Sequence, residues 1–391
     1  MIAAVAAGSA SAATPTDSAA LRDAVKVGDD KTGIKRHLKQ LQVIADANPV
    51  DGVPTRATGT PGHEASAAYV RKQLEAAGYT VSFQPFTAQV FDEPTPPAFS
   101  QVSPTARTFV EGTDFLTMEF SGSGTVTGGT LVPIDFTEPT TTPSASTSGC
   151  EASDFPASVA GNVALIQRGT CTFGEKAQNA LNAGAAAVVM FNEGTIGAPD
   201  RQDLLNGTLG APVGLPVIGT TYALGRELLD AANAGGATIS LTVNGRTRAL
   251  QTKNVIADSP TGRTDRTVVV GAHLDSVFEG PGINDDGSGT ATDLEVALQI
   301  AKLGIKPVNR LRFIFFAGEE QGLLGSDFYV SQLSKQQVKD TAVMLDFDML
   351  ASPNYARFVY DGDGSSLGFA GPNGSGTVES VFNDYFDSQG L

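Results

Sequence analysis

The sequence contains no tryptophan, only two cysteines and only three histidines among its 391 residues. Two cysteines are too few for a cysteine-rich zinc site, and a three-histidine site would need every histidine, drawn from unrelated segments. Any bound metal ion must therefore take most of its ligands from carboxylates. Basic residues are also scarce, because 26 Lys and Arg stand against 42 Asp and Glu, a net charge of −16. This acidity argues against nucleic acid or an anionic membrane surface as a partner.

Long hydrophobic runs are missing as well. After the first residues, no apolar run approaches the roughly 20 residues that a membrane-spanning helix needs. Residues 1–13 form a short apolar run that ends in the small-residue pattern Ala10-Ser11-Ala12. This pattern is typical of the end of a signal peptide and predicts a secreted, extracellular protein, with an alanine-rich tail as the alternative. Two cysteines fit export, where a bridge can persist, whereas in a cytosolic protein they would be unrelated thiols.

The chain is longer than one hydrophobic core usually supports, so we expect two domains. Helical spacing occurs in 34–47 and 64–77, and 79–86 alternates as a strand should. From about Asp92 to Gln251 the sequence changes to short β-type runs separated by Gly, Pro, Ser and Thr. This stretch has a normal domain size and interrupts the α/β part rather than following it.

The α/β pattern resumes from Asn254 onward. Continuous apolar runs at 268–272 and 310–317 are typical of buried strands, 292–303 has helical spacing, and 341–350 predicts a third strand. Such alternation implies a largely parallel sheet with ligand sites at the carboxyl ends of its strands. We therefore predict an α/β fold with a mixed, largely parallel sheet flanked by helices, interrupted by a β-rich domain.

Metal-type ligands follow each of these three predicted strands and also stand in a Gly-rich turn between the first two. They are His273, Asp275, Asp285, Asp286, Glu319, Glu320, Asp346 and Asp348. Adjacent acids at strand ends repel one another and are costly to bury without a cation. One histidine and several carboxylates suit a hard or borderline divalent ion, and zinc accepts this mixture. Taken singly, Asp285 or Asp286 before a helix is more often an N-cap than a ligand, but the joint pattern favours a metal site.

These motifs also occur in the order found in a known family. The segments His273-Leu274-Asp275, 282–289, Glu319-Glu320 and Phe347-Asp348-Met349 resemble those of the secreted di-zinc aminopeptidases of metallopeptidase family twenty-eight. The resemblance covers 34–86 and 254–391 and implies the zinc-exopeptidase, phosphorylase/hydrolase-like fold.

The intervening segment resembles a protease-associated domain, through 161–169 and 183–190. The two resemblances imply a peptidase domain at 31–94 and 252–391 and an inserted protease-associated domain at 95–251. In that domain type the two cysteines are commonly bridged, which implies a disulfide between Cys150 and Cys171.

The resemblance to the aminopeptidases also implies a role for each site residue. His273 and Asp348 would hold one zinc ion, Glu320 would serve a second, and Asp285 would bridge both. Asp275 would orient His273. Glu319 would be the general base that acts on the bridging water.

Two further expectations come from the same family. It often has a cis peptide between the bridging acid and its successor, here Asp285 and Asp286. The implied function is a secreted zinc-dependent aminopeptidase that hydrolyses N-terminal residues from peptides or proteins with a free N-terminus. The sequence gives no information on oligomeric state.

The sequence departs from the family pattern in two places. Asp346 stands where Asn is frequent, and no histidine follows His273, although the second zinc histidine is expected beyond Tyr385. We therefore expect a C-terminally truncated sequence that binds one zinc ion well and the second poorly, and that is inactive or badly folded. The other two histidines are expected outside the site, His63 beside a helix start and His37 on a helix surface.

Other functions on the same scaffold remain open. A carboxypeptidase would need a cationic group to receive the substrate carboxylate, and glutaminyl cyclases of this type work with a single zinc ion. A receptor-like binding module that has lost its metals is a further alternative. Retention of His273, Asp285, Glu319, Glu320 and Asp348 speaks against such a module.

Overall fold

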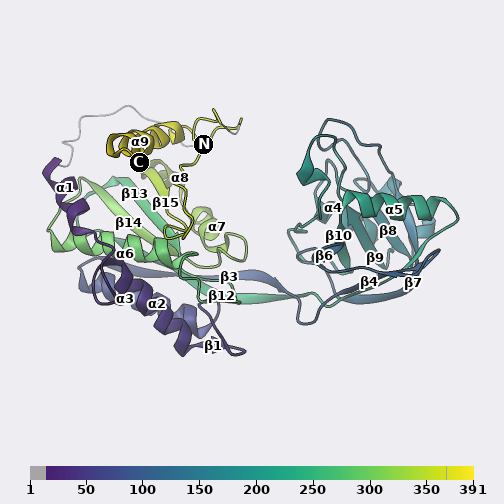
Figure 1. The fold of residues 1–391 in the computed structure, drawn as a ribbon, viewed down its shortest axis with the longest axis horizontal. Coiled ribbons are helices and arrows are strands. Elements are labelled where there is room, and N and C mark those ends of the chain that lie inside the picture. Colours follow the sequence, from purple (N-terminus) through teal and green to yellow (C-terminus); the bar gives the residue numbers. More distant parts are fainter. Residues whose placement is uncertain (1–14, 367) are drawn as a thin grey trace. The chain divides into compact units, whose positions relative to one another are not determined.

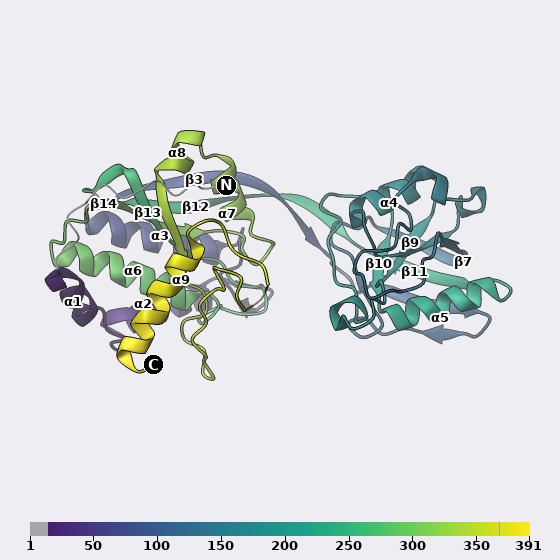
Figure 2. The same ribbon diagram turned by 90° about the horizontal axis from the view of Figure 1, so that it is seen from above.

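The computed structural model describes residues 15–366 and 368–391, so the signal peptide predicted at 1–13 lies outside the described residues. The chain divides into two compact units (Figures 1 and 2). The first contains the described residues up to Ala88 together with Leu250–Leu391, and the second is Gln89–Ala249. The boundaries fall within strands β3 (Thr80–Asp92) and β12 (Arg246–Asp258). The second unit is thus inserted between two halves of the first.

The first unit is built on a five-stranded sheet in the order β15-β13-β14-β12-β3. Strand β13 (Arg263–His273) runs parallel to both β14 (Asn309–Phe316) and β15 (Thr341–Asp346), whereas β12 pairs with β14 in the antiparallel direction. The predicted mixed α/β sheet is therefore confirmed. The carboxyl ends of β13, β14 and β15 lie at one edge of it.

Helices cover both faces of this sheet. Phe313 and Phe315 of β14 pack with helices α3 (Pro61–Ala76) and α6 (Gly287–Lys302), whereas Ile314 and Phe316 pack with Tyr329 of α7 (Leu324–Ser331). Because side chains alternate along a strand, these two clusters lie on opposite faces. The other elements of the unit are α1 (Pro15–Ala24), α2 (Gly33–Ala47), β1 (Pro49–Val50), β2 (Val53–Pro54), α8 (Lys335–Asp340) and α9 (Ser375–Gln389).

The start of α6 differs from the prediction. The apolar spacing predicts a helix over 292–303, but α6 begins at Gly287 because the Asp286 carboxylate caps it by accepting a hydrogen bond from the Gly289 backbone. Gly287, Ser288 and Gly289 are too small or too polar to extend a hydrophobic pattern. The helix therefore starts beside the strand end that carries His273.

The second unit contains an eight-stranded sheet in the order β5-β4-β11-β7-β8-β9-β10-β6. Strands β7 to β10 run parallel to one another, and the helices α4 (Phe173–Asn182) and α5 (Tyr222–Asn233) pack on opposite faces of the sheet. The strands are β4 (Ala98–Ser103), β5 (Arg107–Thr108), β6 (Phe115–Thr117), β7 (Gly124–Ile134), β8 (Val163–Gln167), β9 (Ala187–Phe191), β10 (Val217–Thr220) and β11 (Thr238–Val243). Cys150 and Cys171 form the disulfide that the sequence predicts.

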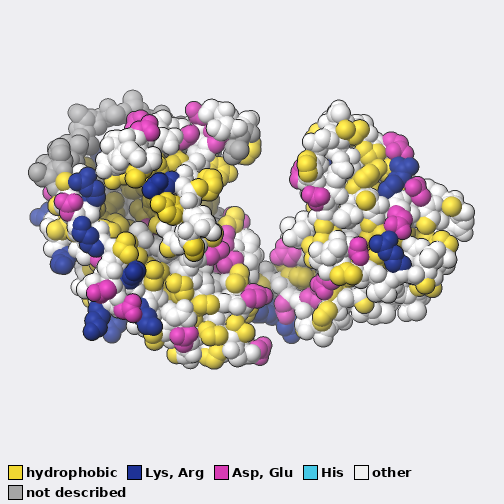
Figure 3. All heavy atoms as spheres, viewed as in Figure 1, with side chains coloured by type: hydrophobic (Ala, Val, Ile, Leu, Met, Phe, Trp, Pro, Cys, Tyr) yellow, Lys and Arg dark blue, Asp and Glu magenta, His cyan; other side chains and the backbone are white. Residues whose placement is uncertain are grey.

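The surface of the chain is uneven in charge. Lys and Arg side chains gather over α1, α2 and α6 on the face drawn in Figure 3. Within 15–366 and 368–391, no helix is both long and apolar enough to cross a membrane.

Candidate metal centre

The site lies where three parallel strands of the first unit end. β13 ends at His273, β14 ends at Phe316 shortly before Glu319, and β15 ends at Asp346 shortly before Asp348. Parallel strands bring their carboxyl ends to one edge of the sheet, so side chains that are distant in sequence meet there. The N-terminus of α6 faces the same edge.

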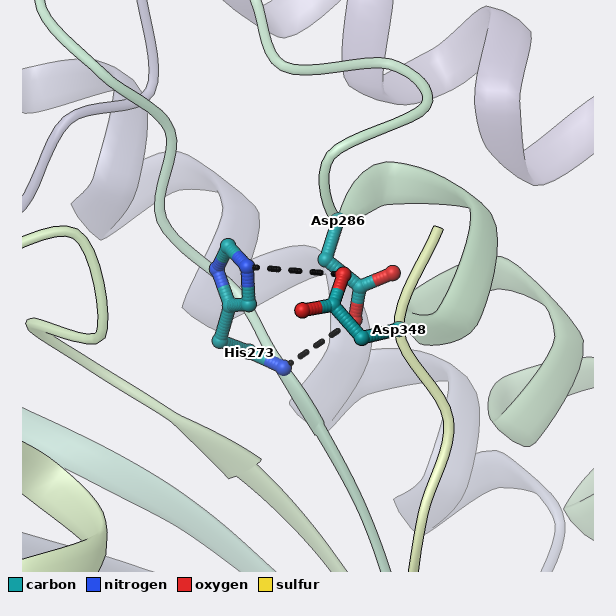
Figure 4. A group of neighbouring side chains, drawn as sticks. All are labelled: His273, Asp286 and Asp348. Carbon is teal, nitrogen blue, oxygen red and sulfur yellow. Dashed lines mark hydrogen bonds and ion pairs between the residues drawn. The ribbon is translucent and has the colours of Figure 1, made fainter. Parts of the chain in front are cut away.

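The imidazole of His273 is at the centre of this group. Its Nε2 lies 3.0 Å from Oδ1 of Asp285, 3.8 Å from Oε2 of Glu319 and 3.9 Å from Oδ1 of Asp348. Figure 4 shows the ring pointing toward the Asp348 carboxylate. Ligand-type atoms of His273, Asp285 and Glu320 all lie within 4.8 Å of one another. The structure therefore brings together the residues that the sequence predicts as ligands and base.

Asp275 contacts both His273 and the turn that carries Glu319 and Glu320. It is fully buried, and its Oδ1 lies 3.5 Å from Nδ1 of His273. The same carboxylate accepts hydrogen bonds from the backbone N–H groups of Glu319 and Glu320, at 3.3 and 3.4 Å. Asp275 is thus placed to fix both the ring of His273 and the turn that carries the two glutamates.

Asp286 has a different task from its neighbour Asp285. Its carboxylate accepts hydrogen bonds from the backbone N–H groups of Gly289, Met349 and His273, at 2.8, 3.2 and 3.2 Å. Figure 4 shows the hydrogen bond from His273. Both of its oxygens are therefore engaged by the chain. The peptide between Asp285 and Asp286 is cis, as the family resemblance implies. Asp286 joins the three segments of the site, and Asp285 lies beside His273.

Crowding of acids perturbs their ionisation. Burial raises the pKa of Glu320 to about 7, with the Asp285 charge adding to the shift, and burial raises the pKa of Asp286 to about 8. Burial also raises the pKa of Glu319 and of Asp348. Burial alone would lower the pKa of His273, but its interaction with Asp275 outweighs this and raises it to about 10. The carboxylates of this group repel one another unless a cation lies among them.

The donor set fits zinc. Tetrahedral zinc with bonds of about 2.0–2.2 Å holds its ligand atoms about 3.3–3.6 Å apart, and the distances of 3.0 and 3.9 Å from His273 Nε2 bracket that value. Oε1 of Glu320 is shielded from solvent and has no hydrogen-bond partner among the described residues. A buried carboxylate oxygen without a partner is rare in folded proteins, and a metal ion would satisfy it.

The other two histidines lie outside this group. His63 is fully buried near the start of α3. The prediction that His37 lies on a helix surface is wrong, because His37 is buried between Tyr69 and Glu295, with contacts of 2.6 and 3.1 Å. Arg36 and Lys39 stand close to His37 in α2, so the sequence suggests that this side of the helix is exposed. The contact of His37 with Glu295 of α6 has no signal in the sequence.

Sequence reasoning missed two supports of the site, both in the loop before α3. Arg56 is fully buried against the loop that precedes Asp285, and the hydroxyl of Thr58 accepts a hydrogen bond from the Gly318 backbone at 2.8 Å. A lone arginine and a lone threonine have no spacing that reveals such contacts. Only the position of Arg56 just before a helix, among short polar residues, could have drawn attention to it.

Comparison with known proteins finds a matching family for each unit. Residues 254–390 match the model for peptidase family M28, and residues 126–228 match the PA domain. An aminopeptidase of Pseudomonas aeruginosa is 43% identical over 361 residues, which cover 92% of this chain and 65% of that protein. The chain thus spans about 65% of the length of this relative. Leucine aminopeptidase 2 of Trichophyton tonsurans is 32% identical over 377 residues, which cover 95% of this chain and 68% of that protein.

Solved structures give the same result. The aminopeptidase from Aneurinibacillus sp. strain AM-1 superimposes with a TM-score of 0.63 at 28% identity, covering 82% of this chain and 71% of that one. BSAP, a zinc aminopeptidase from Bacillus subtilis, gives a TM-score of 0.51 at 26% identity, covering 81% and 69%. With two matching domain models, similar folds and a relative of 32% identity covered over 68% of its length, this chain belongs to peptidase family M28 and carries an inserted PA domain.

Proposed function

We propose that this chain is a secreted, zinc-dependent aminopeptidase that removes N-terminal residues from peptides. The observation that carries the proposal is the convergence of ligand atoms from His273, Asp285 and Glu320 within 4.8 Å, beside the carboxylate of Glu319. The names of the relatives support the reaction, and the zinc aminopeptidase BSAP supports the metal. The disulfide between Cys150 and Cys171 supports export, because such bridges persist in oxidising compartments.

The ligands divide naturally between two ions. His273 and Asp348 would hold one zinc ion, Glu320 the other, and Asp285 would bridge them. Asp286 also lies within reach of His273 and Asp348, but its oxygens already accept three backbone hydrogen bonds. We therefore assign Asp286 to holding the site together and not to binding the metal.

Glu319 is the residue placed for proton transfer. Zinc, when bound, supplies a Lewis acid that polarises the scissile carbonyl and activates water. Glu319 would accept a proton from the attacking water and pass it to the nitrogen of the leaving amine as the C–N bond breaks. Its side chain is 35% exposed and its Oε2 lies 3.8 Å from Nε2 of His273, so it reaches both the ligand group and the solvent side.

The charge of the site favours an aminopeptidase over a carboxypeptidase. The exposed carboxylates suit the cationic amino group of a peptide N-terminus. A carboxypeptidase needs a free cationic side chain for the substrate carboxylate. Arg56, the arginine coupled to these acids, is buried and donates to the backbone carbonyls of Leu274, Pro281 and Gly282.

Zinc analysis and substrate choice test the proposal. The chain, loaded with zinc and freed of excess metal, is expected to retain zinc. A version extended at its C-terminus, which the expected truncation calls for, is expected to cleave aminoacyl p-nitroanilides and free peptides from the N-terminus. Failure to retain zinc, or cleavage confined to N-blocked peptides or C-terminal residues, would contradict it. Release of pyroglutamyl products from N-terminal glutamine would instead identify a cyclase.

The general base is tested by Glu319→Gln. This change keeps the shape of the side chain but removes its capacity to take a proton, so kcat is expected to fall by roughly 100- to 10,000-fold while zinc content is unchanged. Glu75→Gln is a matched control, because Glu75 is an exposed residue of α3 paired with Arg71. A Glu319→Gln variant with the kcat of the control would rule out this role.

A further inference from the structure

Arg56 is a fully buried arginine in the loop between β2 and α3. Each of its three guanidinium nitrogens donates to a backbone carbonyl. Nη1 donates to Leu274, Nε donates to Pro281 at 2.8 Å and Nη2 donates to Gly282 at 2.6 Å. No carboxylate in the described part of the chain forms an ion pair with Arg56 within 4.0 Å. The side chain therefore serves the backbone and not an acid.

The three carbonyls belong to the two segments that carry the proposed ligands. Leu274 stands between His273 and Asp275 at the end of β13. Pro281 and Gly282 open the turn that leads to Asp285. One rigid, planar group thus sets the separation between the strand end and the turn, which a flexible ammonium group cannot do at three points.

The residues around Arg56 extend the same connection. Its backbone N–H donates to the hydroxyl of Ser276 at 3.0 Å, and the hydroxyl of Thr55 donates to the carbonyl of Val277 at 2.9 Å. The hydroxyl of Thr58 accepts from the Gly318 backbone at 2.8 Å, directly before Glu319. Residues 55–58 therefore contact the segments of His273, Asp285 and Glu319, and all four are buried.

Charge alone would not place an arginine here. A positive group coupled to Asp285 and Glu320 opposes a zinc ion held by these two acids. It also offsets the mutual repulsion of those acids while the metal is absent. Its position is explained if the ligand segments must keep their arrangement before zinc binds.

We infer that Arg56 is a positioning residue that holds the loops of His273 and Asp285 in their zinc-binding arrangement in the metal-free protein. The inference rests on the proposed function, because it takes this group as the zinc site. It assigns a role in metal binding to a side chain that does not touch the metal.

Arg56→Lys separates geometry from charge, because lysine keeps the positive charge but has all its donors on one nitrogen and cannot reproduce the planar spacing of the three guanidinium nitrogens. Zinc affinity, measured by competition with a chromophoric chelator, is expected to fall by ~10- to 100-fold, as for other groups that hold ligands in place. Arg312→Lys is the matched control. Arg312 lies in β14, four residues before the end of the strand, and donates to Asp258 and Tyr329. This variant is expected to melt at a lower temperature but to bind zinc as the wild type does.

The outcomes distinguish this inference from the proposed function. If the wild type binds no zinc, the proposed function fails. If the wild type binds zinc and Arg56→Lys binds it equally well, the role of Arg56 is overturned. Equal weakening in Arg56→Lys and Arg312→Lys would also overturn it, since general loss of stability would then explain both.

A measurement on the wild type needs no folded variant. Hydrogen exchange of peptides covering 273–289 in the metal-free protein reports the loop directly, through amides such as those of His273, Gly287 and Gly289, which are hydrogen-bonded within it. Slow exchange before zinc is added is the expected result. Fast exchange that slows only with zinc would mean that the metal, and not Arg56, orders the loop.

Discussion

Both units place polar side chains after neighbouring parallel strands, but they use them differently. In the second unit, Gln167 at the end of β8 donates to the carbonyls of Thr137 and Glu193. Glu193, just after β9, accepts from the backbone N–H groups of Ser144 and Ala145 at 2.9 and 2.6 Å. In the first unit, Oε1 of Glu320 is shielded and has no partner among the described residues.

The difference separates structural polar groups from functional ones. A buried polar group with all its hydrogen bonds made within the chain holds a loop in place, as Glu193 does. An acid such as Glu320, whose shielded oxygen lacks a partner and whose own pKa is raised by burial and by neighbouring acids, costs stability, which indicates a ligand that restores it. Position at a strand end is therefore not sufficient to identify a functional site. The hydrogen-bond partners of the polar group show whether it is structural or available to a ligand.

Removal of the central ligand is expected to give the largest effect. A zinc site with four ligands gains roughly 2.5–4 kcal/mol from each, so His273→Ala should weaken zinc binding by roughly 100- to 1000-fold while the second unit stays unchanged. Chelator competition measures this. His37→Gln, a change at a buried histidine outside the site, is the control and should keep zinc affinity. Unchanged affinity in His273→Ala would place any zinc site elsewhere.

The reverse experiment removes Glu193 of the second unit, an acid whose hydrogen bonds are made within the chain. Glu193→Ala leaves the backbone N–H groups of Ser144 and Ala145 and the hydroxyl of Thr195 without their partner, which should destabilise this unit by roughly 2–3 kcal/mol. Hydrogen exchange of peptides from Gln89–Ala249 gives the loss, and zinc affinity should not change. Glu227→Ala, an exposed residue paired with Arg107, should cost less than ~1 kcal/mol. Equal losses of stability in the two variants would contradict the distinction between buried, hydrogen-bonded acids and exposed ones.

His37 of the first unit, whose ring is hydrogen-bonded to Tyr69 and Glu295, is expected to give a smaller, pH-dependent effect on stability. Burial lowers the pKa of His37 from 6.5 to about 4, with Arg36 adding to the shift and Glu295 opposing it. The unfolded chain then binds a proton at His37 at a higher pH than the folded chain does, so the stability that depends on this residue is lost as the pH falls from 6.5 toward 4.

The measurement compares urea unfolding of the wild type and His37→Gln. The stability difference between them should shrink by roughly 1–2 kcal/mol between pH 6.5 and 5, because groups common to both proteins cancel. A difference that stays constant over this range would mean that His37 is as accessible as the sequence predicts.

Most of the fold was accessible from the sequence, but not its irregular parts. Apolar runs predict β13 and β14 because both strands are buried in the sheet centre. Strand β12 was not predicted, because its first half, from Arg246, is mostly polar and does not form an apolar run. Helix α9 also escaped, although Val378, Phe382 and Phe386 recur at a spacing of four residues.

The candidate site divides in the same way. His273, Asp285, Glu319 and Glu320 stand next to predicted strands or a Gly-rich turn, so the pattern of acids reveals them. Arg56 lies more than two hundred residues from the carbonyls that it contacts. Backbone carbonyls have no sequence signature, so no pattern could reveal its role.

The sequence by itself determined the kinds of groups available: one imidazole among many carboxylates, at the ends of strands that must be buried because they are apolar. The tertiary structure decided which groups keep a free oxygen and which are engaged by the backbone. Asp285 and Asp286 are adjacent and chemically identical, yet Asp286 binds three backbone N–H groups while Asp285 lies beside His273. Hydrogen bonding in three dimensions, and not residue type, separates a candidate ligand from its support.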